Sequence, residues 1–483
     1  MVKTLRTRFA PSPTGYMHIG NLKAALFGYL LAKNAGGKFI LRIEDTDQER
    51  IVEGAVDVIY KTLKTAGIYH DEGPDIGGSY GPYVQSERKA GYRQYAEELI
   101  AKKHAYYCFC DKARLAGLAE QGISYDRHCL KLTQEQVDVK LAEGTPHVVR
   151  QLIPQGFTTF TDEVFGEITV DNKDIEDQVL IKSDGMPTYN FANVVDDHLM
   201  QITHVLRGSE YLTSTPKYNL LYDALGWEIP KYVHLPLVLN EKGEKMSKRK
   251  GDFSFEDLLA MGFLPQAIVN YIVLLGFSPP DNREIFSLGE LVEVFSVGSM
   301  SKSPAIFDMA KLRWVNSEHF KAMDDVIFFK IAKDKISDAV RRADIDRMQL
   351  AQMAKTRVST LSEIPSLFDF IDEMQEYDIE LYSHKKMKTD PKIAHEILKE
   401  LLPKLEAYEN SFRNDDIYEF LTAYSEASDR KNSQVLWSIR TAVSGKPATP
   451  GGASEIMALL GKAECIKRVG QAIEKLEATY QGK

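Results

Sequence analysis

Residues 8–21 read Arg-Phe-Ala-Pro-Ser-Pro-Thr-Gly-Tyr-Met-His-Ile-Gly-Asn and decide the fold, because they separate a predicted strand from a predicted helix. The apolar and basic run Thr4–Phe9 leads into this stretch and is typical of a strand. Two prolines and Gly15 then force a rigid turn that neither a strand nor a helix can continue through. After Gly20 the apolar residues recur at helical spacing. We therefore expect a strand, a tight loop and a helix in succession.

A second strand completes this unit. The predicted helix carries Leu22, Leu26 and Leu30 on one stripe, a pair of glycines ends it, and residues 39–43 then predict a strand. A strand, a helix and a parallel strand form a right-handed βαβ unit. Such a unit binds phosphate groups at the end of its first strand, where the helix N-terminus begins. His18 lies at this point, so the predicted α/β fold places a histidine beside a phosphate site.

Two motifs carry a resemblance to a known family. Residues 12–15 and 18–21 resemble the HIGH signature of class I aminoacyl-tRNA synthetases, in the form found in the glutamyl enzymes. Alone, the His-x-Gly-x motif fits a core histidine in an ordinary loop equally well. Residues 245–249 read Lys-Met-Ser-Lys-Arg, and a basic loop alone is more typical of a solvated surface turn. The two motifs together, however, have the order and rough spacing that class I synthetases share.

The length and charge of the chain limit its organisation and its partners. A chain of 483 residues is too long for one core and predicts about three or more domains. The formal net charge of −9 argues against general nucleic-acid affinity, but a local basic face can still bind tRNA. No apolar run approaches the roughly 20 residues of a membrane span, and the first residues lack the apolar core of a signal peptide. Four cysteines make no disulfide framework, so we expect a cytoplasmic protein that binds no membrane.

The resemblance implies an α/β fold in four parts. A Rossmann-type catalytic domain is expected over residues 1–85 and 184–249, with an inserted α+β module that grips the tRNA acceptor end over 86–183. A stem-contact module is expected over 250–325, and an all-helical anticodon-binding domain over 326–483. The residues agree, because short alternating segments in the insertion predict antiparallel strands and the last part is helical in spacing. The helical tail argues against the glutaminyl enzymes, whose anticodon domain is built of β-barrels.

Two local patterns predict where helices begin and end. Thr46, with Glu49 three residues later, reads as a capping box for a helix that carries Val52, Ala55, Ile59 and Leu63. This interpretation is compatible with a substrate-binding role for the residues just before Thr46. In the last part of the chain, an apolar stripe ending at Leu401 predicts a helix that Pro403 kinks or ends.

By the resemblance, glutamate is bound by a defined set of side chains. Arg8 reads the side-chain carboxylate of the substrate, Arg207 meets its other carboxylate, and Glu44 contacts its amino group. Two arginines suit a dicarboxylic amino acid, because a guanidinium binds a carboxylate through two parallel hydrogen bonds. The complete predicted glutamate set is Arg8, Ala10, Ser12, Glu44, Tyr189, Asn193 and Arg207.

By the resemblance, ATP binds beside His18 and the lysine loop, together with Mg²⁺. The carboxylate of glutamate attacks the α-phosphate of ATP to give an adenylate, and the terminal ribose hydroxyl of tRNA then takes the glutamyl group. This chemistry needs alignment and neutralisation of phosphate charge, and no covalent enzyme intermediate. His18, Lys245 and Lys248 are the predicted catalytic residues. The predicted ATP set is Ser12, His18, Gly20, Asn21, Glu210, Lys245 and Lys248.

Three of the four cysteines lie within 22 residues, at Cys108, Cys110 and Cys129. A Cys-x-Cys pair with a later cysteine suits a tetrahedral structural zinc site, and the alternative is three buried cysteines. Some glutamyl enzymes supply a histidine two residues after the last cysteine, where this chain has a lysine. Tyr125 matches a Tyr-x-x-x-Cys variant of a shortened relative and is the predicted fourth ligand, with His128 as the other candidate. Cys465 is expected in a core.

The expected partners are L-glutamate, ATP and tRNA(Glu), bound by a monomer; the sequence leaves open whether tRNA(Gln) is also charged. Three other functions agree less well with the sequence. A small-molecule nucleotidyltransferase has no use for the helical tail, and a shortened relative that attaches glutamate to a tRNA base lacks that tail. A noncatalytic tRNA-binding paralogue is expected to have lost His18, Lys245 or Lys248, and all three are present.

Overall fold

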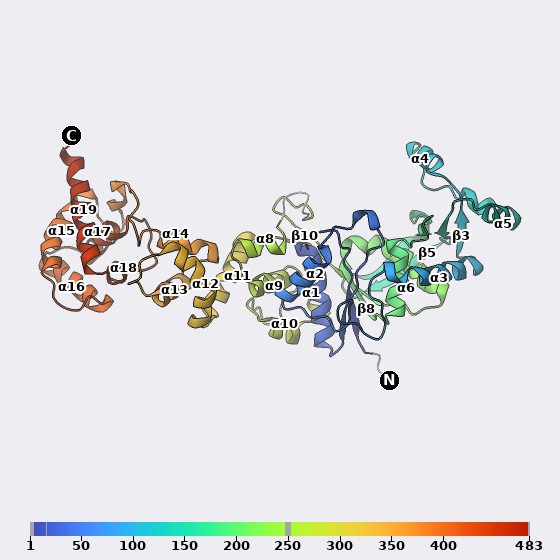
Figure 1. The fold of residues 1–483 in the computed structure, drawn as a ribbon, viewed down its shortest axis with the longest axis horizontal. Helices are drawn as coiled ribbons and strands as arrows, with labels where there is room; N and C mark the ends of the chain where they lie inside the picture. The colour runs from blue at the N-terminus through green and yellow to red at the C-terminus, as the bar shows by residue number, and fades with distance from the viewer. Residues whose placement is uncertain (1–3, 16, 247–252, 482–483) are drawn as a thin grey trace. The chain divides into compact units, whose positions relative to one another are not determined.

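The computed structural model describes residues 4–15, 17–246 and 253–481 (Figure 1). Strand β1 (Arg6–Phe9) pairs in parallel with β2 (Lys38–Leu41), and helix α1 (Ile19–Asn34) connects them. The predicted βαβ unit is therefore confirmed, with element boundaries shifted by one or two residues. The three leucines predicted to share a stripe of α1 are all fully buried.

A second parallel pair repeats this arrangement. Strand β8 (His204–Gly208) pairs with β9 (Lys231–Leu235), and α7 (Thr215–Leu225) connects them. The two pairs meet where Thr203 lies beside Arg6: the backbone N–H of Thr203 donates to the Arg6 carbonyl at 3.0 Å, and the Arg6 N–H donates to the Thr203 hydroxyl at 2.8 Å. The carboxyl ends of β1, β8 and β9 thus open on the same side.

The predicted insertion contains the antiparallel strands expected of it. Its three-stranded sheet has the order β3 (Ala105–Cys108), β4 (Val148–Gln151), β7 (Val179–Ile181). The hairpin of β5 (Phe157–Asp162) and β6 (Gly166–Asp171) is also antiparallel. The hairpin additionally extends the catalytic sheet, because β5 pairs in parallel with β9 where Asp162 faces Tyr232. Helices α3 (Lys89–Ala101), α4 (Lys112–Glu120) and α5 (Gln134–Ala142) complete this region.

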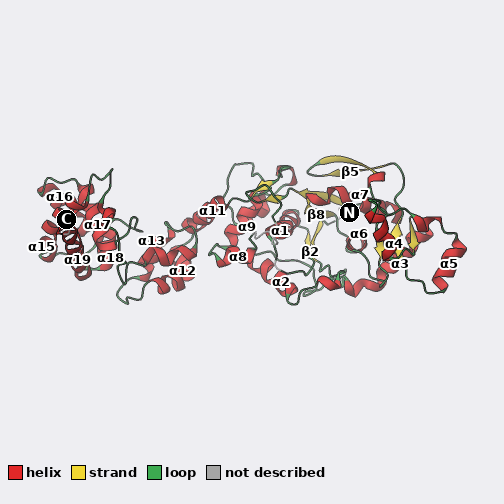
Figure 2. Cartoon of the chain, turned by 90° about the horizontal axis from the view of Figure 1, so that it is seen from above, coloured by secondary structure: helices red, strands yellow, loops and turns green. Residues whose placement is uncertain are grey.

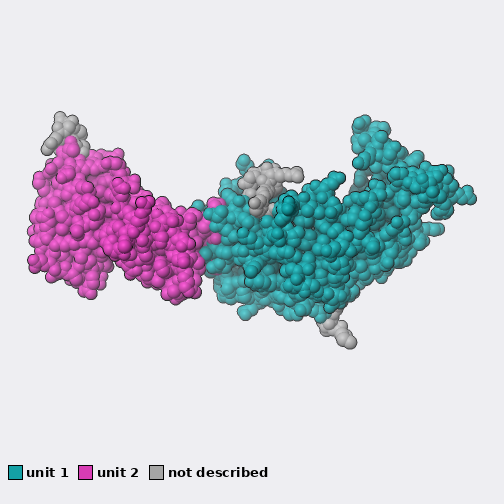
Figure 3. All heavy atoms as spheres, in the orientation of Figure 1, with its two compact units in different colours: residues 1–260, 264–315 teal, residues 261–263, 316–483 magenta. Residues whose placement is uncertain are grey.

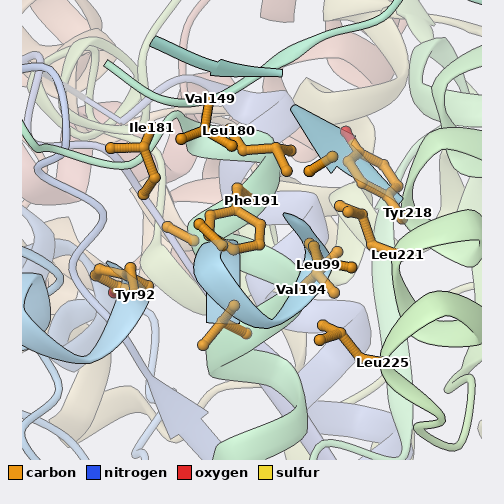
Figure 4. Close-up of a cluster of buried hydrophobic side chains, with 14 of the residues drawn as sticks. Tyr92, Leu99, Val149, Leu180, Ile181, Phe191, Val194, Tyr218, Leu221 and Leu225 are labelled. Carbon is orange, nitrogen blue, oxygen red and sulfur yellow. The ribbon is translucent and has the colours of Figure 1, made fainter. Parts of the chain in front are cut away.

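One apolar cluster joins the insertion to the catalytic fold (Figure 4). Phe191 of helix α6 (Tyr189–Leu199) lies at its centre and is fully buried. Tyr92 and Leu99 come from α3, and Leu221 and Leu225 come from α7. This packing anchors α6, whose first turn borders the candidate site.

The capping box predicted at Thr46 and Glu49 is wrong. The chain there makes only a short 3₁₀ turn, Gln48–Arg50, and helix α2 (Ala55–Thr65) begins after Gly54, whose φ is 77°. Val52 is 49% exposed and precedes the helix, whereas Ala55, Ile59 and Leu63 are buried on α2, as predicted. The reason is tertiary: the N–H groups of Glu44 and Val52 donate to carbonyls of the proline loop, at Pro11 and Pro13, each at 3.0 Å. These bonds hold the two ends of the segment beside that loop.

The chain divides into two compact units, residues 1–260 with 264–315 and residues 261–263 with 316–483 (Figure 3). The first unit also contains α8 (Phe255–Ala260), α9 (Pro265–Leu274), α10 (Leu288–Val294) and the parallel pair of β10 (Val238–Leu239) and β11 (Ala305–Ile306). Helix α11 (Met309–Ala322) spans the boundary in sequence. None of the helices in the described ranges is long and apolar enough to cross a membrane.

The predicted helical character of the last part is confirmed (Figure 2). Its helices are α12 (Asp325–Ala339), α13 (Arg347–Lys355), α14 (Ile364–Phe368), α15 (Pro391–Glu406), α16 (Asn414–Ala427), α17 (Asn432–Ser444), α18 (Ala453–Leu460) and α19 (Lys462–Gln481). Pro403 lies inside α15, which runs on to Glu406, so this proline does not end the helix. Cys465 is fully buried, as predicted.

Candidate active site

A pocket of about 390 Å³ lies at the carboxyl ends of β1, β8 and β9. All but two of the residues predicted to bind glutamate or ATP line it: Arg8, Ala10, Ser12, His18, Gly20, Asn21, Glu44, Tyr189, Arg207, Glu210 and Lys245. Asn193 does not line the pocket but lies directly behind it, where its amide donates to Glu44 Oε1 at 3.2 Å. Lys248 lies outside the described residues. The predicted set is therefore brought together around one cavity, wherever the structure describes it.

His18 stands at the beginning of α1 and faces the pocket. It is the residue before the first helical turn, with φ −83° and ψ 162°, and its carbonyl accepts the N–H groups of Asn21 and Leu22. The first turn contains no acidic side chain, so the positive end of the helix dipole is not neutralised locally. A Cβ added to Gly20 would meet no atom within 4 Å, so the space in front of this turn is open. The geometry suits an anion such as a phosphate.

Arg8 is held at the pocket floor by a buried carboxylate. Its Nε donates to both oxygens of Asp197, at 3.0 and 3.2 Å, and Asp197 also accepts from Arg42 at 2.7 Å. Burial disfavours the charged guanidinium, but Asp197 raises the pKa of Arg8 above its ordinary value. Arg8 therefore remains a cation in a largely desolvated site.

Glu44 presents one satisfied and one unsatisfied oxygen. Its Oε1 accepts from Arg42 at 2.8 Å, from Asn193 at 3.2 Å and from Gln85 at 3.4 Å. Its Oε2 is buried, and no hydrogen-bond donor reaches it from the part of the chain that the structure describes. Burial raises the pKa of Glu44, while the guanidinium groups of Arg42 and Arg8 oppose this shift. A buried carboxylate oxygen without a donor is costly, and a cationic donor such as an ammonium group would satisfy it.

Arg207 faces the pocket from the strand beside Arg8. Its Nε donates to His234 Nε2 at 3.1 Å and its Nη2 donates to the Thr215 hydroxyl at 2.7 Å. The guanidinium also lies 4.5 Å from the ring centre of Tyr218. Because Arg8 itself reaches the carbonyl of residue 206, at 3.4 Å, the two arginines border one cavity from adjacent strands. Two fixed guanidinium groups suit a ligand with two carboxylates.

Lys245 lies on the other side of the pocket and is paired with Glu210 at 2.6 Å. The two side chains are 55% and 37% exposed. Asn240 shapes the turn before Lys245, because its side-chain oxygen accepts the N–H groups of Lys242 and Glu244 at 3.0 Å. At the helix start, His18 forms an isolated antiparallel bridge with Ser254.

The sequence analysis missed several buried ions around the pocket. Arg42 donates to both Glu44 and Asp197 and is fully buried, yet its only signal in the sequence was a charged residue among the apolar residues 39–43. Lys23 lines the pocket, is 2% exposed and donates to the carbonyls of Pro236 and Leu275 at 2.8 and 3.0 Å. Burial lowers the pKa of Lys23 to about 7.

The cysteine cluster forms in the insertion, outside the pocket. The sulfur atoms of Cys108, Cys110 and Cys129 all lie within 4.8 Å of one another, and those of Cys110 and Cys129 are 3.5 Å apart. The hydroxyl of Tyr125 is 3.2 Å from the sulfur of Cys108. His128, the other candidate ligand, is exposed and does not belong to this group. Burial and the neighbouring thiols raise the pKa of Cys110 to about 12, and a bound cation would favour the ionised form of this thiol.

Comparisons with known proteins agree on one family. A family model described as "tRNA synthetases class I (E and Q), catalytic domain" matches residues 4–314, and one described as "Anticodon binding domain" matches residues 318–473. Curated glutamate–tRNA ligases from Clostridium botulinum and Clostridium novyi are 54% and 53% identical to the chain. The first alignment covers 99% of this chain and 100% of the relative, and the second covers 98% and 99%.

Solved structures give the same result. A glutamate tRNA ligase from Elizabethkingia meningosepticum, crystallised in complex with its amino acid, matches with a TM-score of 0.88 and 33% identity. A glutamate–tRNA synthetase from Elizabethkingia anophelis matches equally well. Both alignments cover 98% of this chain and 100% of the solved one. With its pocket of two arginines and its helical second unit, this chain belongs to the glutamate–tRNA ligase family of class I aminoacyl-tRNA synthetases.

Proposed function

We propose that the pocket activates L-glutamate with ATP and passes it to the 3′ end of tRNA(Glu), as the resemblance implies. The chain is a ligase of its family and attaches glutamate to tRNA in translation. The observation that carries the pocket assignment is the combination of Arg8, Arg207 and the unsatisfied Oε2 of Glu44 around one cavity. Two guanidinium groups and one orphan carboxylate oxygen match two carboxylates and one ammonium group, the three charged groups of glutamate.

In this proposal the amino acid is held from three sides. Arg8 takes the side-chain carboxylate, Arg207 takes the other carboxylate, and Glu44 accepts the ammonium group. Tyr189 closes the wall on the α6 side, and Ala10 and Ser12 border the site on the proline loop. Asn193 acts through Glu44, whose Oε1 it helps to fix.

ATP is assigned to the end of the pocket formed by α1 and the lysine loop. Glutamate's carboxylate oxygen attacks the α-phosphorus, the bond from that phosphorus to the bridging oxygen of the β-phosphate breaks, and pyrophosphate leaves. His18 and the N-terminus of α1 donate hydrogen bonds to the phosphates, and Lys245 and Lys248 neutralise their charge together with Mg²⁺. Gly20 leaves room for the nucleotide, and Ser12, Asn21 and Glu210 lie around it.

The cysteine cluster fits a structural zinc ion. Tetrahedral zinc with Zn–S bonds of about 2.3 Å places its sulfur ligands about 3.8 Å apart. Cys110 and Cys129 are close to that separation at 3.5 Å, and Cys108 lies within the same group. Tyr125 supplies an oxygen at the fourth position. A bound zinc would tie β3 to the loop before α5 in a region that has only a small core of its own.

The tRNA roles of the remaining parts are proposals from the resemblance. They assign the catalytic domain to residues 1–85 and 184–249, acceptor binding to 86–183, stem contact to 250–325 and anticodon binding to 326–483. We also propose a monomer that acts in the cytoplasm. Charging of tRNA(Gln) is an open second activity, and aminoacylation of the purified tRNA isoacceptors with glutamate decides it.

The pocket assignment is tested by ATP–pyrophosphate exchange with tRNA present, using glutamate, glutamine and aspartate. Glutamine should be a very poor substrate, and Arg8→Ala should lose about 2–5 kcal/mol in kcat/KM for glutamate, because a substrate carboxylate is left unpaired. Arg8→Lys is the matched variant: it keeps a cation for Asp197 but loses the guanidinium fork, so it should keep the fold and still lose activity. Efficient exchange with glutamine by the native protein contradicts the assignment.

A further inference from the structure

We propose that His234 and Asp162 are positioning residues of the glutamate pocket, which fix the guanidinium of Arg207 through a buried hydrogen-bond chain. The inference rests on the proposed role of Arg207 in binding a substrate carboxylate. Neither His234 nor Asp162 lines the pocket. Both side chains are fully buried.

The chain of bonds fixes the tautomer of His234. Arginine has only N–H donors, so the Nε2 of His234 must accept the bond from Arg207 Nε at 3.1 Å. The imidazole proton is therefore on Nδ1, which donates to Asp162 Oδ2 at 2.7 Å. An aspartate that accepts from Nδ1 selects this tautomer of a histidine. Asp162 thus determines whether His234 can accept from Arg207 at all.

Asp162 is itself rigid. Its Oδ1 accepts the N–H groups of Val164 and Phe165 at 2.9 and 2.8 Å, and its Oδ2 also accepts the N–H of His234 at 3.1 Å. It ends strand β5 opposite Tyr232 of β9. The inserted hairpin therefore contributes a fixed anchor to the pocket from a strand that does not line it.

The hydrogen bonds to His234 and Thr215 also determine which part of the Arg207 guanidinium can bind a ligand. His234 and Thr215 hold the edge formed by Nε and Nη2, the latter at 2.7 Å. Among the described residues, no hydrogen bond engages Nη1. The end of the guanidinium that carries Nη1 is thus left to face a carboxylate in the pocket. Without His234 the group could rotate about its long side chain, and the site would lose its preformed geometry.

Protonation of His234 would reverse this arrangement. Asp162 and Arg207 contact its two nitrogens, Thr215 lies 3.4 Å from Nε2, and the rings of Tyr232 and His234 stack at 5.9 Å. The carboxylate of Glu210 also favours the protonated ring, more weakly than Asp162 does. Burial lowers the pKa of His234, Arg207 adds to that shift, and Asp162 opposes it. A protonated ring would point an N–H at the N–H of Arg207, so glutamate binding should weaken on the acid side, below the ordinary titration range of histidine.

Two matched substitutions test the two hydrogen bonds of the His234 ring separately. In His234→Asn the amide nitrogen can replace Nδ1 beside Asp162, but nothing accepts from Arg207. In His234→Gln the amide oxygen can replace Nε2 and accept from Arg207, so the bond that matters here is kept. We expect the KM for glutamate to rise about tenfold or more in His234→Asn and much less in His234→Gln, with the KM for ATP unchanged in both. The rise in glutamate KM at acid pH should disappear in His234→Gln.

Arg207→Ala, measured alongside, distinguishes failure of this inference from failure of the pocket assignment. A native glutamate KM in Arg207→Ala contradicts the assigned role of Arg207. A raised KM in Arg207→Ala with a native KM in His234→Asn overturns only the positioning role. Equal losses in both His234 variants, with the ATP KM raised too, indicate a purely structural histidine and also overturn it.

A second measurement reports the tautomer directly in the native protein and does not depend on the kinetics of a variant. The ¹⁵N shifts of the imidazoles in the native full-length protein report which ring nitrogen carries the proton, and the signal of His234 is the one lost in His234→Gln. We expect a neutral ring protonated on Nδ1 at pH 7.5. A proton on Nε2, or a doubly protonated ring, would overturn the proposal.

Discussion

The guanidinium of Arg8 lies 3.0 Å from the carboxylate of Asp197, and both side chains are buried. Asp197 also accepts from Arg42, which in turn holds Glu44. Cations and anions therefore alternate along a buried chain that begins and ends with a residue facing the pocket. Arg8 is assigned to a substrate carboxylate and Glu44 to the substrate ammonium group. Asp197 and Arg42, which do not line the cavity, fix these two side chains relative to each other.

Asp197→Asn should destabilise the first unit strongly. The substitution leaves Arg8 and Arg42 buried with a single carboxylate between them, and removal of one partner of a buried ion pair costs about 3–5 kcal/mol. The KM for glutamate should rise as well, because Arg8 loses its anchor. Denaturant unfolding of the native and variant proteins measures the first effect, and steady-state aminoacylation measures the second.

Glu97→Gln is the control for this experiment, because Glu97 pairs with Arg93 on the surface, where the side chains are 52% and 76% exposed. Exposed ion pairs contribute little, so this variant should unfold close to the native protein. Equal behaviour of Asp197→Asn and Glu97→Gln would show that the buried chain is not needed for the fold.

Metal analysis of the purified protein should find about one zinc per chain, and the double variant Cys108→Ser/Cys110→Ser should lose it. Damage should concentrate in the insertion, since a structural zinc stabilises the segment that folds around it. Cys465→Ser is the control: its sulfur is fully buried in the helical unit, so the variant should keep its zinc. A metal-free preparation with full activity and stability contradicts the zinc assignment.

Lys23 should make the stability of the first unit depend on pH. Its pKa in the folded protein is lowered to about 7, against an ordinary value of about 10.4 in the unfolded chain. Between these values the unfolded chain binds more protons, so the free energy of unfolding should rise with pH from about 7 to 10. Below pH 7 both states are protonated, and the cost of burying the charge is paid in full. The neutral amine still has two N–H groups for the carbonyls of Pro236 and Leu275.

Lys23→Met removes the contribution of Lys23 to this pH dependence. All other titrating groups are the same in the two proteins, so the difference between their free energies of unfolding reports Lys23 alone. The variant should gain most relative to the native protein at pH 6.5, and this gain should shrink at pH 9.5. The comparison requires unfolding curves at several pH values. A difference between the two proteins that stays constant across that range contradicts a neutralised Lys23.

The elements with a local signal were predictable from the sequence. The βαβ unit around His18 follows from proline, glycine and leucine spacing, and the helical tail follows from its periodicity. The capping box at Thr46 had an equally good local pattern and was wrong, because backbone bonds to Pro11 and Pro13 compete with helix formation there. Such bonds depend on tertiary structure, and no local pattern records them.

The side chains that surround the pocket were predictable only where a motif contains them. Asp197 meets Arg42 from 155 positions away in sequence, and Asp162 meets His234 from 72 positions away. A buried ion gives no sequence signal for its partner, so these contacts became visible only once the strands were placed. The motifs therefore predicted many of the charged and polar residues that line the cavity but missed Lys23, and of the residues behind the cavity they predicted Asn193 but missed Arg42, Asp197 and Asp162.

The lysine loop should contribute to the rate of the first step and little to the fold. Lys245 is 55% exposed and pairs with Glu210, which is 37% exposed, and exposed pairs contribute little stability. Lys245→Ala, and Lys248→Ala in the part of the loop outside the described residues, should each slow adenylate formation by about 10²-fold if each lysine supplies roughly 3 kcal/mol to the transition state. An interaction made mainly in the transition state lowers kcat more than it raises KM. Lys242→Ala is the control, because this exposed lysine of the same turn does not line the pocket.

The measurement that decides between mechanisms is single-turnover adenylate formation with tRNA bound, with a melting curve for each variant. Melting should stay native in all three variants, and only Lys242→Ala should keep the native rate. Binding of tRNA should weaken modestly, since each substitution removes one charge from the surface that meets phosphates. If adenylate forms at the native rate in Lys245→Ala and Lys248→Ala while tRNA affinity falls, the two lysines bind tRNA, and neutralisation of the ATP phosphates must come from His18, the α1 N-terminus and Mg²⁺ alone.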